Sequence, residues 1–427
     1  MARTSDGSGG AHPAEAGPAL ELAWREHWGR LVGLLIGQTA RPDVAEDAVA
    51  DAFAAAARTW PTSGVPASPG AWLLTAARRR ALDVLRSEAV RRRKQPLMVV
   101  DTELRERAAA TTDPGSHLAD ERLRLVFTCC HPALAPEARV ALTLRFVVGL
   151  DVADITALLL LQEPTAAARL TRAKKRLAAA GIPFVTPAPD RLDERLDVVA
   201  AVLYLVFTAG YQPGPRDRGL RVDLGDEAIR LARLLDEQLP GRPVVRSLLA
   251  LMLLQHSRRD ARLDSDGALV LLPEQDRGRW HGAEIEAGLA VLRDLGPASG
   301  LAEEYRLQAL IAAEHATAPT AADTRWSVVA EHYAALEAHT GSPVVRLARA
   351  VAVAEAWGPA AGLVLLDGLD DALPHHHRPP AVRGELLLRL GRAEEAAHEF
   401  ERALMLVRSD TERRHLEDRA AAAARAV

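Results

Sequence analysis

Apolar residues recur at helical spacing in the first quarter of the chain. The first stripe consists of Leu22, Trp24, Trp28, Leu31, Leu34 and Leu35. A second stripe starts after Pro42 and ends at Trp60-Pro61, and a turn-rich loop follows to Gly70. A third helix is expected from about Ala71 to Arg93. We therefore predict a small helical domain at 19–94, after a Gly-, Ala- and Pro-rich stretch at 1–18 that is expected to be disordered.

A second group of helices is predicted at 116–182, after a polar linker at 95–115. One helix covers 120–130. The next begins with Pro136 at its first position and ends at Gly149, because proline suits a helix start and glycine a helix end. Asp151 then caps a short helix, 152–160, and a turn leads to a helix that begins at Thr165. This order of elements is that of a helix-turn-helix.

The helix from Thr165 has two opposed faces. Leu170, Ala173 and Leu177 form an apolar stripe, and no acidic residue occurs between Thr165 and Pro189. Its basic side chains are Arg169, Arg172, Lys174, Lys175 and Arg176. A solvated basic face is one interpretation. The position as second helix of a helix-turn-helix favours the other, a helix that lies against DNA.

The rest of the chain is also helical by its pattern. A Pro-rich linker is expected at 183–196, and a helical domain at 197–427. The clearest repeat lies between Ala381 and Leu406, where small residues such as Ala396 and Ala403 allow two helices to approach closely. Stacked helix pairs of this kind are typical of repeat proteins with a concave face. The whole chain is predicted to be all-α.

Charge divides the chain into two parts. Residues 1–196 contain 26 basic and 23 acidic residues, whereas 197–427 contain 27 basic and 34 acidic ones. A basic front and an acidic back suggest a nucleic-acid module joined to a domain that does not bind nucleic acid. Aromatic residues make up only 4% of the chain, which favours helices over β-sandwiches.

The cysteines and the apolar stretches of the sequence indicate the cellular compartment. The two cysteines, Cys129 and Cys130, are adjacent and are interpreted as buried thiols in a reducing environment. The N-terminal stretch lacks the apolar core of a signal peptide, and the longest mostly apolar run, from Val198 to Tyr211, is too short for a bilayer. We expect a cytoplasmic protein without membrane, metal or cofactor.

The motifs of the first 182 residues, taken together, resemble those of an extracytoplasmic-function (ECF) sigma factor of bacterial RNA polymerase. Sigma region 2 resembles DVAEDAVADAF at 43–53, PGAWL at 69–73 and ARRRALDVLR at 77–86. Sigma region 4 resembles FTCCHPAL at 127–134, ALTLR at 141–145 and the RLTRAK at 169–174. The resemblance implies that 19–94 is the region 2 domain and that 116–182 is the region 4 domain.

The remaining chain resembles the C-terminal extension of one ECF subgroup, which is similar to tetratricopeptide repeats. Its marks are YLVFTAGY (204–211), EAIRLAR (227–233), LLALM (248–252), EQDRGRW (274–280) and LARAV (347–351). The first motif departs from the subgroup, which usually has Phe-Asn-Glu-Gly-Tyr where this chain has Phe-Thr-Ala-Gly-Tyr. The predicted fold is thus two small sigma domains and a larger TPR-like domain.

The resemblance implies a function without covalent chemistry, so no enzyme activity is expected. The partners are the RNA polymerase core, promoter DNA with its −35 and −10 elements, and an unidentified regulator or ligand of the C-terminal domain. Glu46, Asp47 and Asp51 are the candidate polymerase contacts. The candidate DNA contacts differ between the two promoter elements. For the −10 element they are Trp72, Arg78, Arg79, Arg80 and Arg86. For the −35 element they are Thr165 at a phosphate, Arg169 and Arg172 at guanine edges, and Lys174, Lys175 and Arg176 at phosphates.

Several readings remain open from the sequence. Trp72 is equally well interpreted as a core residue. The histidines at 375–377 are interpreted as part of a solvated loop, with a metal site as the alternative. Glu274, Asp276, Arg277 and Trp280 are interpreted as a structural ion-pair network, with a groove as the alternative. The competing functions are a helical-repeat enzyme and a scaffold that has lost promoter binding. If the chain is an active sigma factor, the C-terminal domain is expected to regulate its activity in cis.

Overall fold

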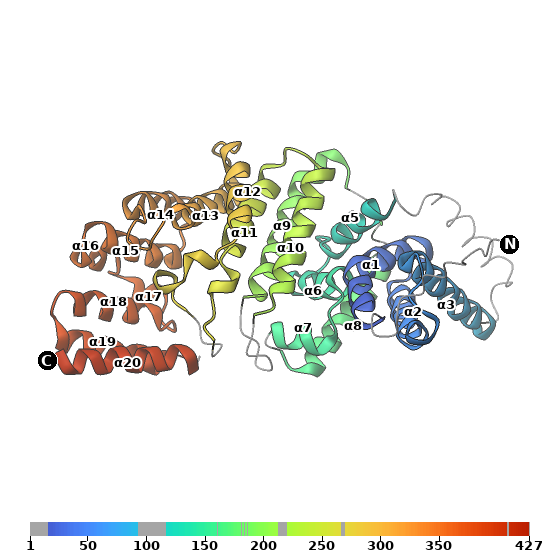
Figure 1. Ribbon diagram of the computed structural model, residues 1–427, viewed down its shortest axis with the longest axis horizontal. Coiled ribbons are helices and arrows are strands. Elements are labelled where there is room, and N and C mark those ends of the chain that lie inside the picture. Colours follow the sequence, from blue (N-terminus) through green and yellow to red (C-terminus); the bar gives the residue numbers. More distant parts are fainter. Residues whose placement is uncertain are drawn as a thin grey trace, which may run out of the picture. The chain divides into compact units, whose positions relative to one another are not determined.

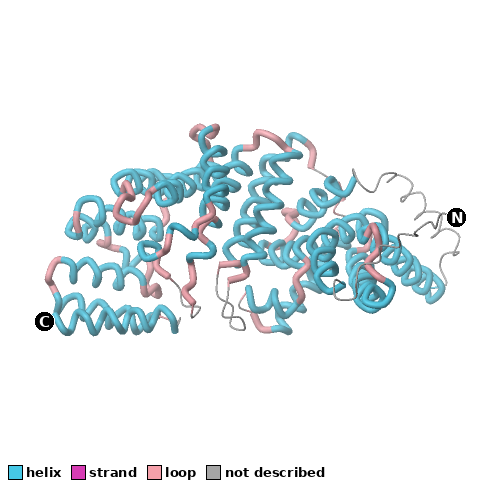
Figure 2. Tube along the Cα trace, viewed as in Figure 1, coloured by secondary structure: helices cyan, strands magenta, loops and turns pink. Residues whose placement is uncertain are grey.

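The computed structural model consists of helices joined by turns and loops (Figure 2). It describes residues 16–92, 117–159, 161–180, 182, 184–185, 187–211, 220–265, 270–407 and 410–426. Over these ranges no β-strand is present. The chain divides into two compact units, 1–238 and 239–427. The expected linker at 95–115 lies outside the described residues, as do residues 1–15 of the expected disordered N-terminus.

The first unit begins with three helices that pack on one another, as the apolar stripes predict. They are α1 (Ala16–Thr39), α2 (Pro42–Ser63) and α3 (Pro69–Arg92). Helix α2 begins at Pro42 as predicted but continues past Pro61. It ends where Gly64 takes a positive φ of 81° and its N–H donates to the Trp60 carbonyl at 3.0 Å.

The second group of helices includes the predicted helix-turn-helix. Its elements are α5 (His117–Cys129), α6 (Pro136–Leu142), the π-helix η2 (Thr143–Val148), α7 (Val152–Leu158) and α8 (Glu163–Ala179). The predicted signals are confirmed at Pro136, at Gly149 with its left-handed φ of 87°, and at Asp151, which accepts a hydrogen bond from the Asp154 N–H at 2.7 Å. The expected single helix to Val148 instead widens into a π-helix after Leu142. Helix α8 starts two residues before Thr165.

Two further helices complete the first unit, namely α9 (Leu192–Ala209), after the short η3 (Pro189–Arg191), and α10 (Val222–Gln238). Both contact α5. The side chain of Arg122 on α5 is buried and pairs with Glu227 on α10 at 3.2 Å, and Arg195 donates to the Phe127 carbonyl at 2.6 Å. Helix α9 begins inside the stretch expected to be a linker, so the first compact unit extends beyond the helix-turn-helix.

The second unit is a succession of helices, most of which pack on the next long helix in the chain. They are α11 (Pro243–His256), η4 (Arg259–Ala261), η5 (Leu272–Glu274), η6 (Arg277–Arg279), α12 (Gly282–Arg293), α13 (Gly300–Thr317), α14 (Trp326–Thr340), α15 (Pro343–Trp357), α16 (Pro359–Leu365), α17 (Leu369–Ala372), α18 (Arg378–Arg389), α19 (Ala393–Leu406) and α20 (Asp410–Ala426). Figure 1 shows α18, α19 and α20 side by side. The predicted pair between Ala381 and Leu406 corresponds to α18 and α19, with Ala396 and Ala403 fully buried.

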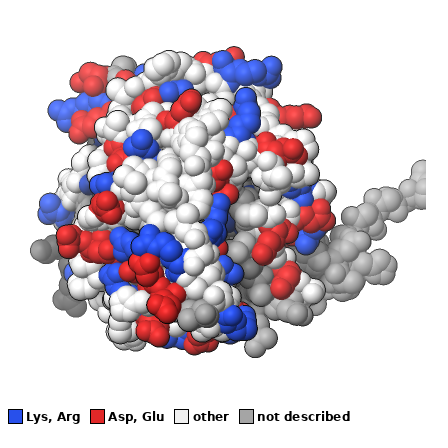
Figure 3. Space-filling model, turned by 90° about the vertical axis from the view of Figure 1, so that its left-hand side faces the viewer, with Lys and Arg blue, Asp and Glu red and all other residues white. Residues whose placement is uncertain are grey.

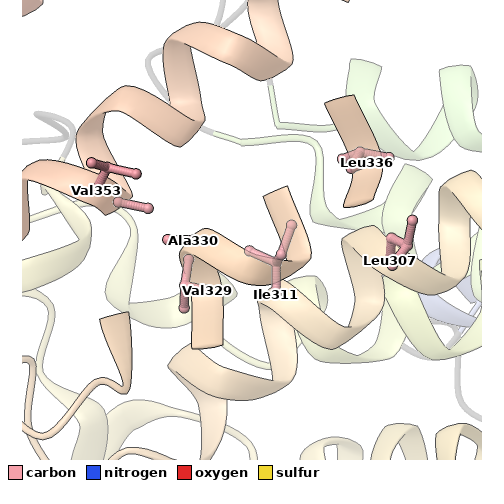
Figure 4. Packing of buried hydrophobic residues seen from close by; sticks show 7 residues of the cluster. Leu307, Ile311, Val329, Ala330, Leu336 and Val353 are labelled. Atoms are coloured by element: carbon pink, nitrogen blue, oxygen red, sulfur yellow. The ribbon is translucent and has the colours of Figure 1, made fainter. Parts of the chain in front are cut away.

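The core of the second unit lies between consecutive helices. Side chains of α13, α14 and α15 meet in one cluster (Figure 4), formed by Leu307, Ile311, Val329, Ala330, Leu336, Ala352 and Val353. A second cluster joins α18, α19 and α20 around Phe400. Close approach of α18 and α19 depends on Gly384, where a Cβ atom would lie 3.1 Å from the Phe400 ring. The helix-pair prediction for this part of the chain is thereby confirmed.

Candidate nucleic-acid interface

Helix α8 presents a basic face on one side and a buried stripe on the other. Leu170, Ala173 and Leu177 are buried, as predicted, against α6 and α7. Arg172, like Thr165, Lys175 and Arg176, is exposed, and Arg169 is partly exposed. The exposed positions are those expected to contact a −35 element. The apolar stripe therefore sets the rotation of the helix and leaves its cationic side to solvent.

Lys174 has a different environment from the other basic residues of α8. Its ammonium group forms an ion pair with Oε2 of Glu46 on α2 and lies 5.8 Å from the centre of the Phe146 ring. Its side chain is 26% exposed. In this conformation Lys174 is therefore directed to a carboxylate inside the first unit and not to a phosphate outside it.

The Glu46 carboxylate joins α2 to the helix-turn-helix. It is only 2% exposed, and its Oε1 accepts a hydrogen bond from Nε of Arg145 at 2.5 Å. Arg145 also donates to the Leu150 carbonyl at 2.7 Å. Two cations thus compensate one buried carboxylate, as burial of a charge requires. The sequence placed Glu46 on a solvent-facing acidic side; the structure instead buries it, because Arg145 and Lys174 reach it from distant parts of the chain.

The other two candidate polymerase contacts remain at the surface. Asp47 and Asp51 are exposed, and Asp51 accepts a hydrogen bond from Nε of Arg80 at 2.5 Å. Partial burial, followed by the neighbouring Glu46, raises the pKa of Asp47. The acidic side of α2 is thus divided, because Glu46 is buried between two cations, whereas Asp47 is exposed and Asp51 pairs with Arg80 at the surface.

A hollow of about 800 Å³ lies between α2 and α3, near the predicted −10 residues. Trp72 borders it and packs edge-on against Trp60, with ring centres 5.8 Å apart. Arg79 and Arg80 line the same hollow and are exposed. Trp72 is partly buried, so it serves both the packing of α3 and the wall of the hollow.

The three consecutive arginines of α3 do not share one role. Nε of Arg78 donates to Oε1 of Gln38 at 3.3 Å, and burial lowers the pKa of Arg78. Arg86 is also partly buried. Sequence reasoning missed Arg58, which lines the hollow from α2. Its signal was available, because Arg58 is the single basic residue in the α2 sequence.

The two modules of the first unit touch through aromatic side chains as well. Trp28 of α1 is buried, and its Nε1 donates to the Arg145 carbonyl at 3.1 Å. A Cβ atom at Gly149 would lie 2.8 Å from the Trp28 ring, and one at Gly29 would lie 2.6 Å from the Val147 carbonyl oxygen. Glycine at these positions is what allows α1 and the end of η2 to approach so closely.

The charged side chains of the second unit are distributed differently from those on the basic face of α8. Figure 3 shows basic and acidic side chains interspersed on the viewed face, without a broad area of one sign. The ion pairs of this unit include Arg383–Asp370 at 2.6 Å and Arg389–Glu355 at 2.6 Å. None of the helices in the described ranges is long and apolar enough to cross a membrane. In the same ranges no group of three potential metal ligands occurs.

Comparison with known proteins connects these modules to transcription. Residues 23–91, the α1–α3 module, match the family Sigma-70 region 2, and residues 124–177, which include α6 to α8, match the family Sigma-70, region 4. The chain is 28% identical over 183 residues to the probable ECF RNA polymerase sigma factor SigI of Mycobacterium tuberculosis, a match that covers 42% of this chain and 62% of that protein. The chain thus carries both sigma-70 modules, and part of it is similar to an ECF sigma factor.

A C-terminal extension follows the two sigma-70 modules. Residues 195–295 match a family of unknown function, DUF6596, and these residues lie on both sides of the boundary between the two units. An uncharacterized protein of Rhizobium meliloti strain 1021 is 41% identical over 401 residues, or 92% of this chain and 93% of that protein. The sigma modules and the extension therefore occur together in that relative. No solved structure matches the chain.

Proposed function

We propose that this protein is a sigma factor, which directs the RNA polymerase core to specific promoters and initiates transcription there. The observation that carries the proposal is the exposed basic face of α8, the second helix of a helix-turn-helix in a region 4 match. A recognition helix of this kind enters the major groove. Arg169 and Arg172 would contact guanine edges, while Thr165, Lys175 and Arg176 would contact phosphates.

Region 2 would act at the −10 element, where a base must leave the duplex. The hollow between α2 and α3 is bordered by Trp72 and by the cations Arg79 and Arg80. An aromatic ring at a hollow and nearby cations suit an extruded base and the single strand that carries it. Arg86 and Arg78 are further candidates. Arg78 would first have to leave Gln38, and Arg80 would have to leave Asp51. Asp47 and Asp51 would contact the polymerase core.

The first unit must open to perform this function. The −35 and −10 elements are about 25 base pairs apart, or roughly 85 Å along B-DNA. Helices α2 and α8 contact each other, and the Glu46 carboxylate links them directly. Separating the modules would release Glu46 toward the polymerase and Lys174 toward phosphate at the same time. The Glu46 contact thus represents a closed state that competes with the promoter-bound state.

The second unit would regulate this activity in cis. The face seen in Figure 3 carries interspersed charges, which are unsuited to DNA, and the extension also supplies α9 and α10 to the first unit. A chain that ends after Gln238 retains those two helices and therefore tests the second unit alone. Unchanged promoter-directed synthesis by that shortened chain would contradict the regulatory role.

Run-off transcription with purified polymerase core and a promoter selected from genomic fragments tests the main proposal. The double variant R169A/R172A should lose promoter-directed synthesis, whereas R414A, an exposed arginine of α20, should retain it. The enzyme alternative would instead give no polymerase recovery in a pulldown together with a metal-dependent activity. The scaffold alternative would give polymerase binding without promoter-directed synthesis.

A further inference from the structure

The second unit contains a pocket that promoter recognition does not use. It has a volume of about 350 Å³ and is formed by α11, α13, α14, α15 and the segment 270–281. Small-molecule sites have volumes of roughly 300–1,000 Å³, so a compact ligand fits. We call this site the α11–α15 pocket.

Most of the wall of the α11–α15 pocket is apolar. The aliphatic side chains that line it are Leu254, Leu272, Ile311, Leu336 and Val345, and the indole of Trp280 adds an aromatic surface. Ile311 and Leu336 belong at the same time to the core cluster of Figure 4. A wall that is continuous with a packed core is held in place, so the pocket is formed before a ligand binds.

Arg277 joins two sides of the pocket. Its guanidinium lies 4.6 Å from the centre of the Trp280 ring and donates to the carbonyl of His315 and to that of Ala318, the second at 3.0 Å. Arg277 thus contacts carbonyl groups, in place of the ion-pair network expected from the sequence. Because one guanidinium holds both the segment 270–281 and the end of α13, the rings of Trp280 and His315 keep their places on the wall.

The polar side chains of the wall differ in how far they are already engaged. Arg258 and Tyr333 have interaction partners within the structure, and Nε2 of Gln308 donates to Oε1 of Glu304 at 3.3 Å. The ring nitrogens of His315, in contrast, have no hydrogen-bond partner among the residues that the structure describes. The imidazole of His315 is therefore the polar group of the wall that we assign to a ligand.

The α11–α15 pocket offers a ligand no unengaged counter-charge. Its described lining includes neither Asp nor Glu, so an ammonium group would find no anion there, and the one lining cation, Arg258, is already engaged. Burial, followed by the nearby Arg258 and Arg277, lowers the pKa of His315 to about 4, so this imidazole is neutral at pH 7. An ionic ligand would lose its hydration here without gaining a counter-ion, which favours a neutral ligand.

We infer that the α11–α15 pocket binds a compact neutral alcohol, whose apolar body contacts the aliphatic wall and whose hydroxyl group forms a hydrogen bond with the imidazole of His315. A neutral imidazole has one N–H donor and one nitrogen acceptor, and the single oxygen of a hydroxyl group can pair with either. A plain hydrocarbon would leave the imidazole without a partner. This inference does not depend on promoter recognition, because the pocket residues all belong to the second unit.

The test compares three probes that share one ring system and differ in charge. Naphthalen-2-ylmethanol, naphthalene-2-carboxylate and the naphthalen-2-ylmethylammonium ion are titrated at pH 7 into the full chain by isothermal calorimetry, without polymerase or DNA. We expect saturable binding of one alcohol per chain. Either ion should bind about 10-fold or more weakly than the alcohol, because its charge would be buried without a counter-ion.

Three variants complete the test. A312F fills the pocket and should abolish binding of the alcohol while circular dichroism shows a folded chain. H315F removes the ring nitrogens and should weaken binding of the alcohol by about 3- to 10-fold, as loss of one neutral hydrogen bond predicts. The control H398F, at an exposed histidine of α19, should leave it unchanged. Absence of saturable binding, equal or tighter binding of either ion, binding that survives in A312F, or an unchanged affinity in H315F would each overturn the inference.

Discussion

The side chain of His315 illustrates how position decides the charge of one residue. Its ring lies 5.3 Å from that of Trp326, in an edge-on arrangement, and burial together with two arginines lowers its pKa to about 4. In an unfolded chain the pKa of histidine is about 6.5. Between pH 6.5 and about pH 4, the unfolded state therefore binds a proton at His315 that the folded state does not bind.

The stability of the second unit should therefore depend on pH through His315. Stability is fully present above pH 6.5 and is lost as the pH falls toward 4, by about 3 kcal/mol at this residue. Urea unfolding of the wild type and of H315F at pH 7 and pH 4.5 measures it. Burial also lowers the pKa of His332, so the wild type keeps part of its slope from other groups. An identical pH slope in both proteins would contradict the assignment to His315.

Single substitutions in α8 should distinguish a residue that contacts a base from a residue that contacts a phosphate. We expect R169A to weaken binding by about 1–3 kcal/mol and to relax the preference at one base pair of the −35 element. K175A should weaken binding to all sequences alike and reduce the salt dependence by about one released counterion. Binding of the holoenzyme to a set of single-base promoter variants at several salt concentrations distinguishes the two. A uniform loss for R169A would refute the guanine contact.

At the scale of elements, local signals in the sequence predicted most helix boundaries. Pro42 and Pro136 begin helices, Asp151 caps one, and Gly149 ends another. These signals act within a few residues, so a single chain displays them. The buried stripe of α8 was equally accessible, because its spacing follows the helical repeat.

Contacts between distant elements could not be predicted in the same way. Glu46 has the helical position of a surface residue, and its burial follows from Arg145, which is 99 residues away. The π-helix η2 also has no local signal in the sequence. Within it, the Arg145 carbonyl accepts a hydrogen bond from Trp28 of α1, which is distant in the sequence. The pocket at Trp280 likewise depends on four helices that meet only after folding.

The pair Arg122–Glu227, which joins α5 to α10, should behave as a buried ion pair. Arg122 is 1% exposed, and burial lowers its pKa to about 9 despite the carboxylate beside it. E227Q leaves that guanidinium without a full counter-charge and should destabilise the first unit by about 3–5 kcal/mol. Denaturant unfolding followed by circular dichroism provides the measurement.

Two further variants calibrate this prediction. The double variant R122M/E227L replaces both charges with apolar groups and should recover most of the loss. D223N removes a carboxylate of α10 from a more exposed pair with Arg221 and should cost about 1 kcal/mol or less. If E227Q lowers the free energy of unfolding by no more than D223N does, the buried pair Arg122–Glu227 contributes no more to stability than the more exposed pair.

At the scale of the whole molecule, the point at which the chain is cut should decide whether the sigma modules fold. A chain of residues 1–238 keeps α9 and α10, whose buried residues include Leu203, Phe207 and Leu231. A chain of residues 1–196 ends within α9, exposes the surface of α5 and leaves Arg122 without Glu227. We expect cooperative thermal unfolding for 1–238 and its loss for 1–196, by circular dichroism. Equal melting temperatures would contradict this division.

The burial of Cys129 and Cys130 in the first unit has a practical consequence. They are the two cysteines of the chain, both are 0% exposed, and burial raises the pKa of Cys130 to about 11 and that of Cys129 well above the ordinary value. Alkylating reagents attack the thiolate, which such a site withholds. Iodoacetamide should therefore modify these sulfurs only during transient exposure. In the unaltered chain, mass spectrometry of the iodoacetamide reaction over time therefore measures the rate at which these buried sulfurs become exposed to solvent.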